Sequence, residues 1–212
     1  DSQHIYFSAN RSDNWEYEPG ESDIFAVDMR GKFTQLTKSA GSESDPSVSP
    51  NGKYIAYSKR DDKKLAYRNT YLHVMEVSGK NDRNLSADVD NSLSNFYWKD
   101  SSGLYYQQML RGITHIDYVT LSNAAHSNVT SGLSGTTLGR PYTSGTFSYA
   151  NSTLAFTKGR HDRPADIYVQ QDNKQKQLTQ LNEDLFGHKT LGAIKEFTYA
   201  SSIDGEEIHG WY

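Results

Sequence analysis

A short pattern recurs four times along this chain of 212 residues, at intervals of 49 to 50 residues. Each copy centres on an aliphatic residue inside a run of about five that also carries aromatic or small polar residues. A fixed period of this length indicates a repeat fold, in which each copy is one supersecondary unit that packs against its neighbours. The four anchors are Ile5, Ile55, Leu104 and Leu154.

The second copy is the most complete and shows what one repeat contains. Turn residues separate four short strand-like runs, and the turn Pro-Asn-Gly-Lys at 50–53 is expected to take positive φ angles at Asn51 and Gly52. The four runs are residues 45–50, 54–58, 71–77 and 82–86. Four antiparallel strands in each 40–50 residues are typical of a β-propeller blade.

The other copies keep the same order of strands. Third strands are expected at 23–27, 115–119 and 166–169, and fourth strands at 35–37, 128–130 and 177–179. A helical fold is disfavoured, because no window keeps a period of 3.6 residues for three turns. The sequence therefore predicts an all-β protein of about four four-stranded antiparallel blades in an incomplete ring.

The period also sets the expected domain boundaries. The blades are expected at 1–41, 42–90, 91–139 and 140–182, followed by a hairpin segment at 183–212. The first copy begins at its second strand, so its innermost strand is expected before Asp1 or is absent. Closed propellers typically have 4–8 blades, and a segment of a larger ring is favoured over a tight four-bladed ring.

Composition excludes several classes of protein. The net charge of −4, without any run of Lys and Arg, argues against a nucleic-acid-binding surface. The absence of cysteine excludes disulfides and thiolate metal sites. No stretch approaches the roughly 18 apolar residues of a membrane span. The abundance of Asn, Ser, Gln and Tyr favours the bacterial periplasm over the cytoplasm.

Two long loops are the candidate binding elements. The loops between the second and third strands open on one face of the blades, and they are long in two copies, at 10–22 and 59–69. Long loops on a rigid scaffold are the usual carriers of binding residues. Partner contact is one interpretation of the first loop, and a polar loop folded back on itself is the other. The exposed candidates in it are Trp15, Glu16, Tyr17 and Glu18.

No motif nominates a catalytic, cofactor or metal site. The segment 88–92 resembles a calcium loop but lacks the following glycine and the distal glutamate. The histidines never pair at i, i+4 or as His-x-His, and the chain has no Gly-x-Ser-x-Gly; the nearest match, at 132–135, lacks the spacing. The chain is thus expected to hold no cofactor and to be inactive alone.

The segment after the blades carries a distinct set of motifs. Two strand-like runs flank Asp204 and Gly205, a strong signal for a hairpin. In order, the chain has Gln-Leu-Thr at 177–179, Leu-Asn at 181–182, Glu-Phe-Thr-Tyr at 196–199, Asp-Gly at 204–205 and Ile-His-Gly-Trp at 208–211. These motifs and the blade pattern resemble the prolyl oligopeptidase family of serine peptidases, particularly its acylaminoacyl-peptidase-like branch. One departure is Ile203, which stands between the serines and Asp-Gly.

The resemblance implies a role for a longer parent protein. In that family a propeller caps the active site of an α/β-hydrolase domain and admits only short or unfolded peptides. The nucleophilic serine would lie downstream of Trp211, outside this chain. The expected partners are a peptide substrate, the hydrolase domain and further copies of the chain, since a part-ring exposes apolar blade faces.

Two other classes remain open. A stand-alone TolB-like propeller would use the loop face to bind a protein partner. A carbohydrate-active propeller enzyme would need two facing carboxylates, and the pattern singles out no acid for that role.

Overall fold

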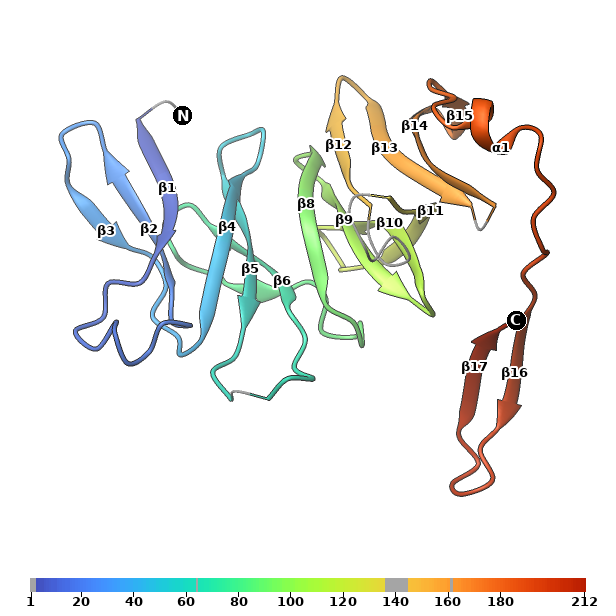
Figure 1. Ribbon diagram of the computed structural model, residues 1–212. Helices are drawn as coiled ribbons and strands as arrows, with labels where there is room; N and C mark the ends of the chain where they lie inside the picture. Colours follow the sequence, from blue (N-terminus) through green and yellow to red (C-terminus); the bar gives the residue numbers. More distant parts are fainter. Residues whose placement is uncertain (1–2, 64, 136–144, 161) are drawn as a thin grey trace. The chain divides into compact units, whose positions relative to one another are not determined.

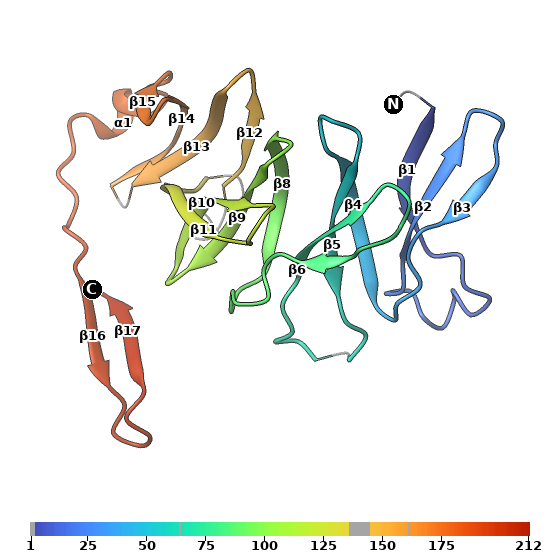
Figure 2. The same ribbon diagram turned by 180° about the vertical axis from the view of Figure 1, so that it is seen from behind.

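The computed structural model is built almost entirely of antiparallel strands (Figures 1 and 2). It describes residues 3–63, 65–135, 145–160 and 162–212. The chain divides into two compact units, residues 1–108 with 116–130 and residues 109–115 with 131–212. The all-β, blade-forming fold predicted from the repeat is confirmed.

The first two repeats form separate sheets. The first sheet has the order β1-β2-β3 and the second has the order β4-β5-β6-β7. Their strands are β1 (His4–Ala9), β2 (Asp23–Asp28), β3 (Phe33–Gln35), β4 (Ser42–Val48), β5 (Tyr54–Arg60), β6 (Tyr71–Glu76) and β7 (Arg83–Asn84). The second repeat thus has the four strands expected from its sequence. Among the described residues the first repeat has three, without a strand on the free edge of β1.

The third and fourth repeats are each four-stranded. Their orders are β8-β9-β10-β11 and β12-β13-β14-β15, and one residue pair, Leu133 with Lys158, links β11 to β13. The strands are β8 (Leu93–Asp100), β9 (Gly103–Leu110), β10 (Ile113–Thr120), β11 (His126–Leu133), β12 (Phe147–Ala150), β13 (Thr153–Arg160), β14 (Arg163–Gln171) and β15 (Lys174–Gln177). The predicted boundary between residues 139 and 140 lies outside the described residues.

The tail is a short helix and a hairpin. Helix α1 (Glu183–Phe186), which the sequence did not predict, precedes strands β16 (Glu196–Ala200) and β17 (Glu207–Trp211). The two strands pair antiparallel, so the hairpin prediction is confirmed. Its loop spans 201–206, where the Ser201 N–H donates to the Glu206 carbonyl at 2.7 Å. The extra residue Ile203 is accommodated in this loop and leaves the strand register unbroken.

The turn at 50–53 differs from its prediction in one respect. Gly52 has a φ of +69°, whereas Asn51 is not among the residues with positive φ. Asn51 acts through its side chain, whose Oδ1 accepts hydrogen bonds from the Ser49 hydroxyl (2.7 Å) and the Lys53 N–H (3.1 Å). An Asx-type turn of this kind gives Asn a role without left-handed backbone.

The fourth strand of a blade ends on a threonine side chain. Thr37 Oγ1 accepts the Ile24 N–H at 2.9 Å, and Thr179 Oγ1 accepts the Ile167 N–H at the same distance. The Thr179 hydroxyl in turn donates to Asp166. In the recurring Gln-Leu-Thr motif, the threonine hydroxyl thus takes the place of the next backbone carbonyl as acceptor. The strands β3 and β15 therefore end two residues earlier than predicted.

Apolar cores lie between consecutive sheets of the first unit. Ile55 and Tyr57 of β5 pack with Ile24 of β2, while Ala56, on the opposite face of β5, packs with Leu104 of β9. Alternate residues of a strand point to opposite faces, so each inner strand serves two cores. Within the described ranges, no helix is long and apolar enough to cross a membrane.

Candidate functional site

A polar groove of about 760 Å³ lies in the first unit, lined in part by both long loops. The two loops lie at the same end of the strands (Figures 1 and 2). The groove is lined by 17–21 of the first loop, 61–62 and Thr70 of the second, and the first residues of the innermost strands β4 and β8. A smaller hollow of about 360 Å³ continues from it along β8, and the two share Asp45, Ser58 and Ser94.

The first loop, 10–22, is folded back on itself. Asn10 Nδ2 donates to the Glu18 carbonyl at 2.8 Å, and the Glu18 N–H donates to the Asn14 carbonyl at 3.0 Å. Tyr17 and Glu18 line the groove. Trp15 and Glu16, the other two candidates from the sequence, are exposed but do not line it.

A glycine ties this loop to the second sheet. The Gly41 N–H donates to Glu21 Oε2 at 3.0 Å, and the Gly41 carbonyl accepts the Ser22 N–H at 3.1 Å. Gly41 has a φ of +113°, and a Cβ built on it would lie 2.1 Å from the Arg60 carbonyl oxygen. Only glycine fits at this junction between the loop and β4.

The second loop is held by an ion pair and by the third blade. Arg68 pairs with Asp61, and this hydrogen bond holds the pKa of Asp61 below its ordinary value. The Leu93 N–H donates to the Thr70 carbonyl at 2.9 Å, at the start of β8. These contacts fix both ends of the second loop.

Bulges place polar side chains on the innermost strands. Asp45 (φ +54°) and Asn95 (φ +53°) interrupt the pairing of β4 with β5 and of β8 with β9. Asp45 lines both hollows, and Asn95 lines the smaller one. Gly145, a further 50 residues on, also has a positive φ, of +129°. Bulges that recur at one place in a repeat are designed features that re-aim side chains.

Carboxylates and hydroxyls dominate the groove. Its carboxylates are Glu18, Glu21, Asp45, Asp61 and Asp62, and its hydroxyls come from five serines and Thr70 besides Tyr17. Arg60 is the one basic residue among the described residues that line it. This surface is rich in hydrogen-bond acceptors and suits a ligand that presents N–H groups or positive charge.

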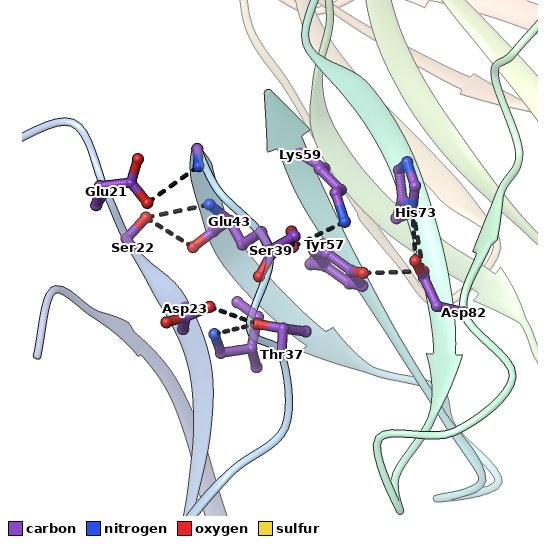
Figure 3. Close-up of polar contacts among 12 residues, drawn as sticks. Glu21, Ser22, Asp23, Thr37, Ser39, Glu43, Tyr57, Lys59, His73 and Asp82 are labelled. Atoms are coloured by element: carbon purple, nitrogen blue, oxygen red, sulfur yellow. Dashed lines mark hydrogen bonds and ion pairs between the residues drawn. The ribbon is translucent and has the colours of Figure 1, made fainter. Parts of the chain in front are cut away.

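A buried carboxylate links the first two sheets (Figure 3). Glu43 of β4 is 1% exposed, and its Oε1 accepts from Lys59 Nζ at 2.9 Å and from the Ser39 hydroxyl. Its backbone N–H donates to the Ser22 carbonyl at 2.9 Å. Glu43 Oε2 has no hydrogen-bond partner among the described residues.

Buried tyrosines are held by polar partners in two successive blades. The Tyr57 hydroxyl donates to Asp82 Oδ1 at 2.9 Å, and Asp82 also contacts His73 Nδ1 at 3.0 Å (Figure 3). In the next blade the Tyr106 hydroxyl lies 2.8 Å from His126 Nδ1. Burial raises the pKa of both tyrosines. We interpret the polar partners as structural: they satisfy the hydrogen bonds of tyrosine hydroxyls that would otherwise be buried without partners.

Asp23 gives the joint between the first two sheets a pH dependence. Its pKa is raised, because burial disfavours the charged form and because the Glu43 carboxylate lies nearby. Such a group holds its proton longer in the folded protein, so stability falls as the pH rises above the ordinary aspartate value of 3.8. We expect Asp23→Asn to gain stability relative to the wild type as the pH rises above 3.8, measured in urea unfolding series.

Asp28 provides the control of opposite sign. Backbone hydrogen bonds, first of all from Lys32, hold its pKa below the ordinary value, so its charge stabilises the fold above pH 3.8. Asp28→Asn should therefore lose stability relative to the wild type as the pH rises toward 3.8 from below, and the difference should stay constant at higher pH. Parallel curves for Asp23→Asn and the wild type would contradict the assigned raised pKa.

The groove has no arrangement for nucleophilic catalysis within its described lining, which contains neither histidine nor cysteine. In the part of the chain that the structure describes, no three His, Asp or Glu side chains are grouped as a metal ion would require. The sequence nominated loop candidates at 15–18 but no catalytic, cofactor or metal residue, and Glu43, Asp45 and Asn95 were missed.

No protein-family model and no curated protein matches the sequence. Solved structures do match the fold. The acylaminoacyl peptidase of Pyrococcus horikoshii matches 99% of this chain at 18% identity, with a TM-score of 0.73. The shared feature is the β-propeller fold. The chain spans 30% of the length of that peptidase.

Two other propeller proteins match less well. An oligogalacturonate lyase, solved in complex with manganese, matches 98% of this chain at 14% identity, with a TM-score of 0.62. The match covers 61% of the lyase. TolB from Acinetobacter baumannii matches 85% at 16% identity, with a TM-score of 0.59 over 42% of that protein. At these identities the likeness concerns the fold alone.

Proposed function

We propose that this chain is the propeller portion of a serine peptidase similar to acylaminoacyl peptidase, and that it controls the access of peptides to a hydrolase domain. The observation that carries the proposal is the hairpin that follows the blades. The motifs Glu-Phe-Thr-Tyr and Ile-His-Gly-Trp, which the sequence shares with that family, lie opposite each other on β16 and β17, with Thr198 facing His209.

The hairpin also has the surface of a strand pair that another sheet covers. Phe197, Tyr199 and Ile208, which share one face of the hairpin, are each at least 39% exposed. A two-stranded hairpin is marginally stable by itself and needs further strands or a helix against its apolar side. A domain that continues beyond the hairpin would supply that cover.

The groove supports the second part of the proposal, contact with the peptide. An extended peptide presents backbone N–H groups, and the groove offers carboxylate and hydroxyl oxygens with Tyr17 at its rim. Tyrosine is a frequent anchor in binding surfaces, because its ring gives contact area at low entropic cost. The chain's role would be to select peptides, and the chemistry would belong to the serine of the hydrolase domain.

The test uses the full-length protein encoded by the gene that contains this chain. We expect a Gly-x-Ser-x-Gly motif downstream of Trp211 and hydrolysis of short acylated peptides. Tyr17→Ala should raise KM for a peptide of several residues by about five- to tenfold, the usual cost of removing one anchor. A single acylated amino acid attached to a chromogenic group, too short to reach the groove, should be cleaved as before.

Tyr67→Ala is the matched control, since Tyr67 is as exposed as Tyr17 but does not line the groove. Equal effects of both variants on every substrate would reject the groove and leave the peptidase standing. A gene without a hydrolase domain would reject the peptidase, and would favour the TolB-like binding module, in which the same groove binds a protein partner.

A further inference from the structure

A tight turn of the third blade belongs to the second compact unit, as does the hairpin of β16 and β17. Arg111 and Gly112 connect β9 to β10, and both have positive φ, of +49° and +70°. Two-residue turns of this kind match the twist of antiparallel strands and usually carry glycine. Gly112 thus stands at the tip of β9 and β10 as a position without a side chain.

The indole of Trp211 lies on this glycine. A Cβ built on Gly112 would lie 2.8 Å from Trp211 Cη2 and 3.3 Å from Trp211 Cζ2. Contacts this short would push the ring aside, because carbon atoms of different side chains pack at about 3.5–4.0 Å. The indole therefore occupies the space that any side chain at position 112 would need.

The hairpin itself holds the indole in this orientation. Glu207, His209 and Trp211 alternate along β17 and so share one of its faces. The His209 ring stands edge-on to the indole, with the ring centroids 4.4 Å apart, and His209 Nε2 contacts Glu196 Oε1 on the neighbouring strand. The indole is thus held by His209 on the hairpin side and by Gly112 on the side of the turn.

A second contact connects the same two elements. Arg111 Nη2 lies 3.3 Å from Glu207 Oε1. Both side chains are more than half exposed, so this ion pair adds little free energy. Glu207 and Trp211 are the first and last residues of β17, and contacts at both ends of a strand define its direction as well as its position.

The face of the hairpin that lies on the turn is not its apolar face. Phe197, Tyr199 and Ile208 share the other face, because Tyr199 stands opposite Ile208 and Phe197 stands opposite Gly210 in the pairing of β16 with β17. A hairpin that rests on the turn through Trp211 therefore keeps this apolar face turned away from the turn.

We infer that Gly112 and Trp211 are positioning residues, and that the turn between β9 and β10 is a seat that holds the hairpin in one orientation. The seat itself concerns this chain alone. Its consequence rests on the proposed function, since a hydrolase domain that begins with the hairpin would be oriented through Gly112.

Cross-linking tests the seat, because the chain has no cysteine of its own. Arg111→Cys with Glu207→Cys places two thiols at positions whose present side chains reach each other, and a short bismaleimide can join them. Tryptic digestion and mass spectrometry measure how fast the two cysteine peptides become linked within one molecule. The ion pair is lost in this parent variant, so the assay reports the contact of Trp211 with Gly112.

Two substitutions should release the hairpin in this background. Trp211→Ala removes the indole, and Gly112→Asn puts a side chain where the indole lies. Asparagine tolerates positive φ, so the turn keeps its backbone. Each substitution should lower the rate of cross-linking by about tenfold, because the aromatic contact that holds the two elements together is lost.

Two matched controls keep the hairpin on the turn. Tyr199→Ala removes an exposed aromatic ring from the opposite face of the hairpin, and Gly31→Asn changes a turn glycine with a φ of +81° and open space at its Cβ position. Both should cross-link at the rate of the parent variant. A rate that Trp211→Ala or Gly112→Asn leaves unchanged, or that the controls lower equally, would overturn the seat.

The full-length protein separates the positioning role from the proposed function. With Gly112→Asn, KM for a peptide of several residues should rise by about fivefold, and kcat for a single acylated amino acid should stay the same. An unchanged KM in a variant whose hairpin is released would reject the positioning role. A gene without a hydrolase domain would reject the proposed function, while the cross-linking result would still decide whether the seat exists.

Discussion

Lys59→Met is expected to lower the free energy of unfolding by about 3 kcal/mol at neutral pH, because it leaves the Glu43 carboxylate buried without its counter-charge. Glu43 is 1% exposed and receives Lys59 Nζ at 2.9 Å. Urea unfolding followed by tyrosine and tryptophan fluorescence measures the change.

Two further variants separate charge from packing. Lys63→Met, at an exposed lysine in the loop that follows β5, should stay within about 0.5 kcal/mol of the wild type. Adding Glu43→Met to Lys59→Met should restore most of the loss, because an apolar pair often replaces a buried ion pair without cost. If Lys59→Met behaves like Lys63→Met, the ion pair of Glu43 and Lys59 contributes nothing to the free energy of unfolding.

Gly41→Ala is the second substitution with a large expected effect, a loss of about 3 kcal/mol. The new Cβ would lie 2.1 Å from the Arg60 carbonyl oxygen, and the φ of +113° is unfavourable for any residue with a side chain. Strained backbone and overpacking each cost about 1–3 kcal/mol. Since Gly41 also binds Glu21 and Ser22, the first loop should become more accessible to proteases.

Gly20→Ala is the control for this experiment. Gly20 lies in the same loop, has no atom within 4 Å of its Cβ position and is not among the residues with positive φ. Its replacement should change stability by less than about 0.5 kcal/mol. Equal stabilities of the two variants would mean that β4 and the end of β5 can separate at low cost.

The strands could be predicted because their signals are local. In β5 and β6, apolar alternation and the flanking turns place both strands to within two residues of their observed ends. The hairpin of β16 and β17 follows from the same kind of pattern around Asp204 and Gly205. The fourth strands β3 and β15 were predicted to end two residues too late, because a threonine hydroxyl and a backbone carbonyl give the same sequence signal. The fourth strand of the third blade, expected at 128–130, is longer in the structure, His126–Leu133.

The site could be predicted only in part. Loop length identified 10–22 and 59–69 as the binding elements, and both supply residues to the groove. Glu43 was missed because Ser-Glu-Ser-Asp reads as a solvent-exposed run, and its burial depends on Ser22 and Lys59, which are distant in sequence. The bulges at Asp45 and Asn95 had a usable signal, since polar residues that tolerate left-handed backbone recur there at the 50-residue period.

The threonine that ends an outermost strand also protects the rim of the blade. The strands β3, β7 and β15 are three, two and four residues long, and Thr37 and Thr179 occupy the next N–H of the neighbouring strand. An edge so short offers an incoming strand few amides to pair with, which discourages the sheet-to-sheet growth that leads to fibres. Blades can therefore pack against each other through their apolar faces, while their short outermost strands limit pairing with strands of other sheets.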